Sequence, residues 1–100
     1  MSKPYTSNRE TYPMPYIVQD DRPQYEEVLD KLNELLKANP PEAIDGHLNY
    51  VVTRIIKGIY PLRYYHINKA VGVLECIKME FYRRVAAPYE DTKIEQNGDV

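Results

Sequence analysis

The fold of this chain is decided by the stretch Gly72-Val73-Leu74-Glu75-Cys76-Ile77-Lys78-Met79-Glu80-Phe81-Tyr82-Arg83-Arg84. Its large apolar residues recur every three to four positions, which is the period of one helix face. The pattern extends in both directions and predicts a long helix with a wide apolar face toward a core. The members of this apolar stripe are Ile67, Ala70, Val71, Leu74, Ile77, Lys78, Phe81 and Val85.

A second strip of the same helix is polar. Asn68, Glu75 and Tyr82 are seven residues apart and therefore project almost above one another. Together with Asn49 and Thr53 of the preceding helix they form a predicted polar seam. We expect its members to share hydrogen bonds across a helix pair or a subunit boundary. A network that fixes helix register is favoured over a ligand site.

The rest of the sequence predicts two further helices. One covers residues 22–38, with Asp21 as cap and Pro23 in the first turn; the next opens at Asp45-Gly46 and ends at Tyr60-Pro61. The third runs over residues 64–87 and is stopped by Pro88. The prediction is an all-α fold, a small bundle of three principal helices: an extended N-terminal arm (residues 1–16), a helical domain (17–88) and a docked C-terminal tail (89–100).

The length of 100 residues allows one domain with a small core, which favours self-association. No apolar run is long enough to span a bilayer, and the first residues lack the apolar stretch of a signal peptide. A single cysteine, Cys76, permits no internal disulfide. We therefore expect a cytoplasmic homo-oligomer that does not contact a membrane.

Charge is distributed unevenly along the chain. Residues 1–45, 46–84 and 85–100 carry net charges of −4, +5 and −3. A basic middle suits a phosphate-bearing ligand, and ten tyrosines suit interfaces or base stacking. The alternative is that the acidic ends cover the basic middle, within one chain or between copies. We expect a small nucleotide rather than nucleic acid as ligand, with five candidate binding residues: Arg63, Tyr64, Tyr65, Lys69 and Arg83.

Catalytic and metal-binding patterns are weak. The predicted core helices offer only Glu75 and Glu80 as carboxylates, and a spacing of five puts them on different faces, unlike helical magnesium sites. Cys76, His47 and His66 lack the paired spacing of zinc ligands, so Cys76 is expected to be a buried small residue. We predict no catalytic residue, no metal and no cofactor.

Several motifs carry a family resemblance over residues 15–100: Gly46-His-Leu-Asn-Tyr-Val-Val-Thr, Gly72 to Arg84, Pro88-Tyr-Glu-Asp-Thr-Lys-Ile and Asn97-Gly-Asp-Val. They resemble a family of short uncharacterised proteins of bacteria, archaea and their phages. The resemblance implies a domain of unknown function and no activity. Its phage association suggests, by analogy of size and setting, small helical oligomers that sequester the nucleotide signals of host immunity.

Two functions follow as expectations. The first is a non-enzymatic oligomeric binding protein that sequesters a small nucleotide, an anti-defence role if it is encoded by a phage. The second is a structural or protein-interaction component, such as a phage assembly part or an inhibitor of a host protein.

Overall fold

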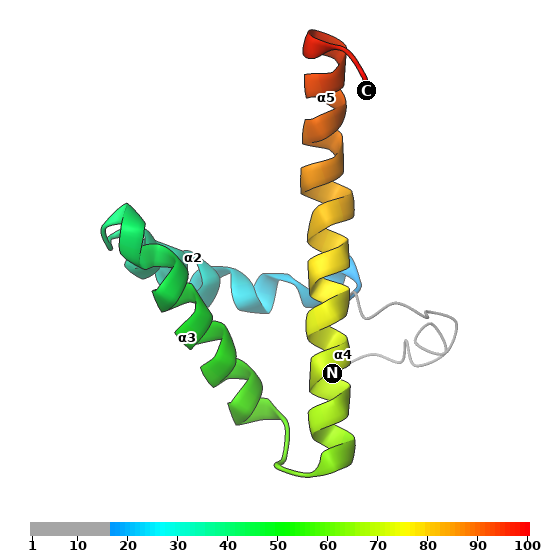
Figure 1. Ribbon diagram of the computed structural model, residues 1–100. Coiled ribbons are helices and arrows are strands. Elements are labelled where there is room, and N and C mark those ends of the chain that lie inside the picture. Colours follow the sequence, from blue (N-terminus) through cyan, green and yellow to red (C-terminus); the bar gives the residue numbers. More distant parts are fainter. Residues whose placement is uncertain (1–16) are drawn as a thin grey trace. The chain divides into compact units, whose positions relative to one another are not determined.

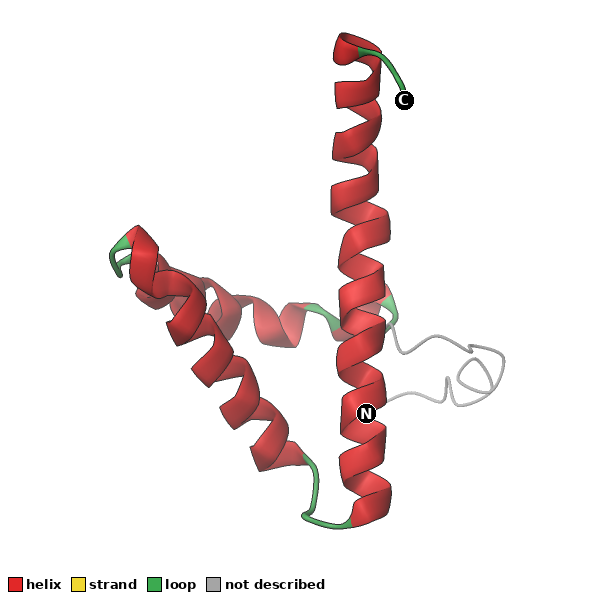
Figure 2. Ribbon diagram, viewed as in Figure 1, coloured by secondary structure: helices red, strands yellow, loops and turns green. Residues whose placement is uncertain are grey.

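The computed structural model describes residues 17–100, and over this range the chain is all-α without a strand (Figure 2). The predicted all-α fold with three principal helices is confirmed. The predicted arm over residues 1–16 lies outside the described residues. The chain divides between Ile59 and Tyr60 into two compact units.

The first unit opens with a short 3-10 turn, η1 (Gln19–Asp21), followed by helix α2 (Pro23–Lys37). The predicted bounds of 22–38 are therefore correct to one residue at each end. The predicted cap is wrong, because the chain is already helical at the N-cap residue Arg22, where φ is −80° and ψ is −37°. Asp21 thus lies one position too early to cap. The side-chain amide of Gln24 instead donates to the Asp21 carbonyl at 2.9 Å.

The turn after α2 ends one helix and begins the next. The Asn39 amide nitrogen Nδ2 donates to the carbonyls of Leu35 and Leu36, at 3.1 Å each, and caps the end of α2. Helix α3 (Pro41–Ile59) starts directly afterwards, so the predicted start at Asp45-Gly46 is wrong. Proline suits a first helical position because its φ is preset and its missing N–H is not needed there. The end of α3 lies where Tyr60-Pro61 predicts it.

The second unit is one uninterrupted helix, which we call the long helix, Tyr64–Asn97 (Figure 1). It comprises α4 (Tyr64–Phe81), a π-helical segment η2 (Tyr82–Ala86) and α5 (Ala87–Asn97). The predicted stop at Pro88 is therefore wrong.

The π-helical segment explains how the long helix passes Pro88. A proline inside an α-helix offers no N–H, and its ring collides with the carbonyl four residues earlier. Directly before it, the Ala87 N–H donates to the Tyr82 carbonyl, five residues back. This wider turn lets the helix continue as α5 to Asn97, and Gly98 follows it as the C-cap residue. Gly98 has a φ of +92°, which glycine adopts at little cost, and its N–H donates to the Ile94 carbonyl at 2.7 Å.

The predicted apolar stripe is present on the long helix, but it does not face a core within its own unit. Ala70, with 6% of its surface exposed, is the one buried hydrophobic residue in the described part of the chain. Ile67, Leu74 and Phe81 remain 44%, 39% and 63% exposed. An amphipathic helix is stable in a protein only when such a stripe packs against another element, and the second unit contains none.

Candidate functional site

Four of the five predicted ligand residues come together at the start of α4. Arg63 is the N-cap residue, in extended conformation, and its carbonyl accepts the Ile67 N–H at 2.8 Å. Lys69 follows Tyr65 by four positions, so the two share one helix face. Its ammonium nitrogen Nζ lies 5.6 Å from the centre of the Tyr65 ring, within cation–π range. The neighbouring Tyr64 is 83% exposed.

The fifth predicted ligand residue, Arg83, lies elsewhere. It belongs to η2, twenty residues after Arg63, a separation of about 30 Å along a helix. Its Nη2 atom donates to both carboxylate oxygens of Glu80, at 3.0 and 3.2 Å. Arg83 therefore cannot share a small ligand with Arg63 of the same chain.

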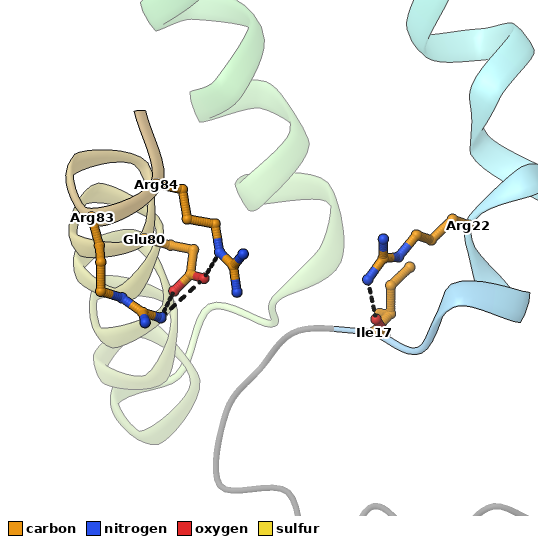
Figure 3. A network of polar contacts seen from close by, with 5 residues as sticks. All are labelled: Ile17, Arg22, Glu80, Arg83 and Arg84. Carbon is orange, nitrogen blue, oxygen red and sulfur yellow. Dashed lines mark hydrogen bonds and ion pairs between the residues drawn. The ribbon is translucent and has the colours of Figure 1, made fainter. Parts of the chain in front are cut away.

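Glu80 joins two arginines at the junction of α4 and η2. Arg83 and Arg84 extend toward its carboxylate from the following turn, and the Arg84 Nε atom donates to Oε2 (Figure 3). These hydrogen bonds, first from Arg84 and then from Arg83, hold the pKa of Glu80 below its usual value. Glu80 lies four residues before Arg84, so the two side chains share one helix face. In the first unit, the Arg22 Nη2 atom donates a hydrogen bond to the Ile17 carbonyl at 3.3 Å (Figure 3).

Tyr82 and Glu90 link the two sides of the π-helical segment. The Tyr82 hydroxyl donates to Glu90 Oε1 at 3.1 Å, and this hydrogen bond, followed by the negative charge of Glu90, raises the pKa of Tyr82. Eight residues of a regular α-helix separate two side chains by about 80° around the axis, whereas seven separate them by only about 20°. The π turn absorbs one residue, so Tyr82 and Glu90 are spaced as if seven apart.

The other members of the predicted polar seam make local contacts. On α3 the Thr53 hydroxyl lies 3.5 Å from Asn49 Oδ1, at the limit of a hydrogen bond. Glu75 pairs with Lys78 at 3.2 Å, and 57% of its side chain is exposed. Asn68 is exposed as well. Within each unit the seam residues are therefore exposed, and their proposed sharing of hydrogen bonds across a subunit boundary stays a prediction.

Cys76 and His66 both lie on α4. Cys76 is exposed, so the expectation of a buried residue is wrong. It is nine positions after Ile67, which places it about 180° from the centre of the apolar stripe. His66 is half-buried and meets the Tyr65 ring edge to face at 5.1 Å. In residues 17–100 no group of three or more His, Cys, Asp or Glu side chains is arranged to hold a metal ion.

Sequence reasoning missed the π-helical segment, although the sequence contained its signal. Pro88 lies inside a stretch whose apolar period continues to Tyr89, and a proline in such a position indicates a distorted helix as readily as a helix end. Glu90 falls within the predicted C-terminal tail, residues 89–100, whereas it lies in α5 and accepts a hydrogen bond from the Tyr82 hydroxyl. No helix in the described range is long and apolar enough to cross a membrane.

Comparison with known proteins gives a family but no activity. Neither curated proteins nor solved structures gave a match. One family model matches residues 14–100, nearly the whole chain. The chain therefore belongs to the family described as domain of unknown function DUF6899.

Proposed function

We propose that this protein is a non-enzymatic, homo-oligomeric interaction module whose apolar helix faces bind other protein chains. The observation that carries the proposal is the exposure of large apolar side chains in both units. A soluble chain rarely leaves a contiguous apolar surface uncovered unless another molecule packs on it. If no other chain bound these apolar faces, Phe81 and its apolar neighbours would stay in contact with water, which is unfavourable in free energy.

Both units contribute exposed apolar residues. In the first unit they include Val28 at 66%, Leu35 at 62% and Ile59 at 63% exposure. In the second they include Phe81 at 63% and Ile77 at 54%. Such residues recur at helical spacing, and this is the pattern that helix-in-groove and helix-bundle partners recognise.

The non-enzymatic part of the proposal is supported by the titratable groups. The pKa of Glu80 is lowered and that of Tyr82 is raised. Glu80 is half-buried and Tyr82 is exposed, and each shift has a structural cause on the same helix, the arginines for Glu80 and Glu90 for Tyr82. Shifted groups often mark catalytic sites, but pairs within one helix surface produce them too.

Two side chains of nearly equal exposure allow a matched test. Phe81 is 63% exposed on the apolar stripe, and Met79 is 60% exposed two residues earlier, about 160° away around the helix. The exposed part of a phenylalanine side chain is about 120 Å², so its burial contributes up to about 3 kcal/mol. Phe81→Ala should weaken self-association by more than tenfold, and Met79→Ala should change it little.

Light scattering at several protein concentrations measures both variants, with circular dichroism as a check that each keeps its helices. Equal masses for wild type and Phe81→Ala at every concentration would contradict the proposed use of the stripe.

A second candidate function is capture of a small nucleotide at the start of α4. It is favoured by the placement of Lys69 over the Tyr65 ring beside Arg63 and exposed Tyr64. Guanidinium and ammonium groups bind phosphate, and tyrosine rings stack on bases. Arg83 is not part of this candidate site. An anti-defence role, if the protein is encoded by a phage, would depend on this capture.

Calorimetry against cyclic and linear nucleotides tests the second candidate. We expect binding to wild type and its loss in Tyr65→Ala, since the ring supplies the stacking surface. No heat at protein concentrations near about 100 μM would exclude affinities of practical interest and leave protein interaction as the function.

A further inference from the structure

We propose that a second copy of this chain packs antiparallel along the long helix, so that the start of each helix lies beside the end of its partner. This inference rests on the proposed function and adds the partner, the surface and the direction. Three features carry it: a coiled-coil seam, a reversed charge distribution along the helix, and the length of the helix.

The seam follows a seven-residue repeat. Ile67, Leu74 and Phe81 occupy equivalent positions, and Ala70 and Ile77 lie three residues after the first two. Apolar residues spaced alternately three and four apart are the positions through which two helices interlock as a coiled coil. The three larger leading residues are between 39% and 63% exposed, so the seam is open within its own unit.

Charges at the two ends of the long helix oppose its dipole. A helix is stabilised by acidic residues in its first turn and basic residues in its last turn. Helices α2 and α3 follow this rule, with Glu26 and Glu42 at their starts and Lys37 and Lys57 at their ends.

The long helix does the reverse. Its first turn holds no acidic residue and its last turn no basic one. Instead, Arg63 and Lys69 form a basic end, and Glu90, Asp91 and Glu95, offset only by Lys93, form an acidic end.

A second antiparallel copy compensates for this arrangement. The acidic end of each helix then lies beside the basic end and the positive dipole end of its partner, at both ends of the pair. A parallel copy would bring like charges together at both ends, which is unfavourable. The direction therefore follows from the charges, and the symmetric result is an isologous two-fold interface.

The length of the helix argues for a copy of itself as the occupant. α4, η2 and α5 contain 18, 5 and 11 residues, which gives a helix about 50 Å long. α2 and α3 have 15 and 19 residues and reach only about 22 and 28 Å. The stripe from Ile67 to Val85 covers about 27 Å, so α3 is long enough for the stripe itself, but neither helix also reaches both charged ends. A second long helix matches the length and supplies the complementary charges.

The distance between spin labels on two copies tests the direction. Because Cys76 is the only cysteine and is exposed, Cys76→Ala removes it with little disturbance, and Gln96→Cys then places one label near the acidic end. In an antiparallel pair the two labels lie about 45–50 Å apart, whereas in a parallel pair they lie within about 20 Å. Pulsed electron spin resonance on the full chain distinguishes these values.

Charge reversal gives an independent test. Reversal of the basic end (Arg63→Glu with Lys69→Glu), or of the acidic end (Asp91→Lys with Glu95→Lys), should raise the dimer dissociation constant at least tenfold. The effect should shrink in about 1 M salt, where charges are screened within a few ångströms. The matched control is the chain with all four substitutions, in which opposite charges again meet and affinity returns toward wild type.

The outcomes separate the inference from the proposed function. A long label distance with rescue by the four-fold variant supports the antiparallel pair. If the chain self-associates but the label distance is short, or if charge reversal at either end does not change the dissociation constant, the antiparallel pair is wrong. The proposed interaction module is not contradicted by either result. A chain that stays monomeric at about 100 μM overturns both.

Discussion

Pro88→Ala tests the physical cause of the π-helical segment. Alanine restores the missing N–H and removes the ring that collides with the preceding turn. The segment Tyr82–Ala86 should then relax from π to α geometry, which is the favoured form over long stretches. Relaxation rotates α5 by about one residue, or roughly 100°, relative to α4.

The expected change in stability follows from two opposing terms. Proline in a helix interior costs about 3 kcal/mol relative to alanine, and the π turn already relieves part of that cost. The rotation also separates Tyr82 from Glu90, whose hydrogen bond contributes about 0.5–1.5 kcal/mol. We therefore expect Pro88→Ala to stabilise the long helix by about 1–2 kcal/mol and to abolish the Tyr82–Glu90 contact.

Carbon-13 resonances of the tyrosine rings report the contact directly. The pKa of Tyr82 is raised above 10.0 because its hydroxyl donates to Glu90, so in Pro88→Ala it should fall back toward that value. Glu90→Gln is the matched control, since it lowers the pKa of Tyr82 by removing the charge and leaves the π turn in place. A Pro88→Ala chain that keeps both the raised pKa of Tyr82 and the wild-type stability would refute the assignment of the π turn to Pro88.

Three further predictions concern the long helix. Gly72→Ala should stabilise it by about 0.5–1 kcal/mol in thermal unfolding, because a Cβ there meets nothing within 4 Å and alanine is the better helix former; a loss of stability would mean that a partner backbone approaches Gly72. Glu75→Ala should change the free energy of unfolding by under about 0.5 kcal/mol, since its pair with Lys78 is exposed; a loss above about 1 kcal/mol would place the seam in a buried interface. The pKa of Glu80 is lower in the folded chain than its ordinary value of 4.5. The ionised carboxylate therefore stabilises the folded chain at pH values above 4.5, and this stabilisation is lost as the pH falls through the lower pKa of the folded chain. The acid loss of helicity should therefore be smaller in Glu80→Gln than in wild type, and identical acid profiles would contradict the role of the Arg84 contact.

The sequence predicted helices well where the signal was local. The apolar period and Pro23 located α2 to one residue at each end, because a proline acts on the adjacent turn. The start of α3 was misplaced for a related reason. Proline is compatible with the first position of a helix, and α3 begins at Pro41. Asp45-Gly46 resembles a helix start but lies within the second turn of α3.

The candidate site was predicted in part. Tyr65 and Lys69 were both named as ligand residues from the sequence, and the structure places the Lys69 ammonium over the Tyr65 ring. The separation of Arg83 from Arg63 could not be read from the charge of a whole segment, because net charge does not report position along a helix. The exposure of the apolar stripe could not be predicted from the sequence either. An apolar period indicates which face of a helix is covered, but it does not indicate whether the same chain or another molecule covers it.

Sedimentation equilibrium of the full chain measures whether the apolar stripe binds a further copy. Over concentrations of about 1 to 100 μM, the mass should rise from the 11.8 kDa of one chain toward twice that value or a higher multiple. A constant mass of 11.8 kDa throughout this range would contradict it.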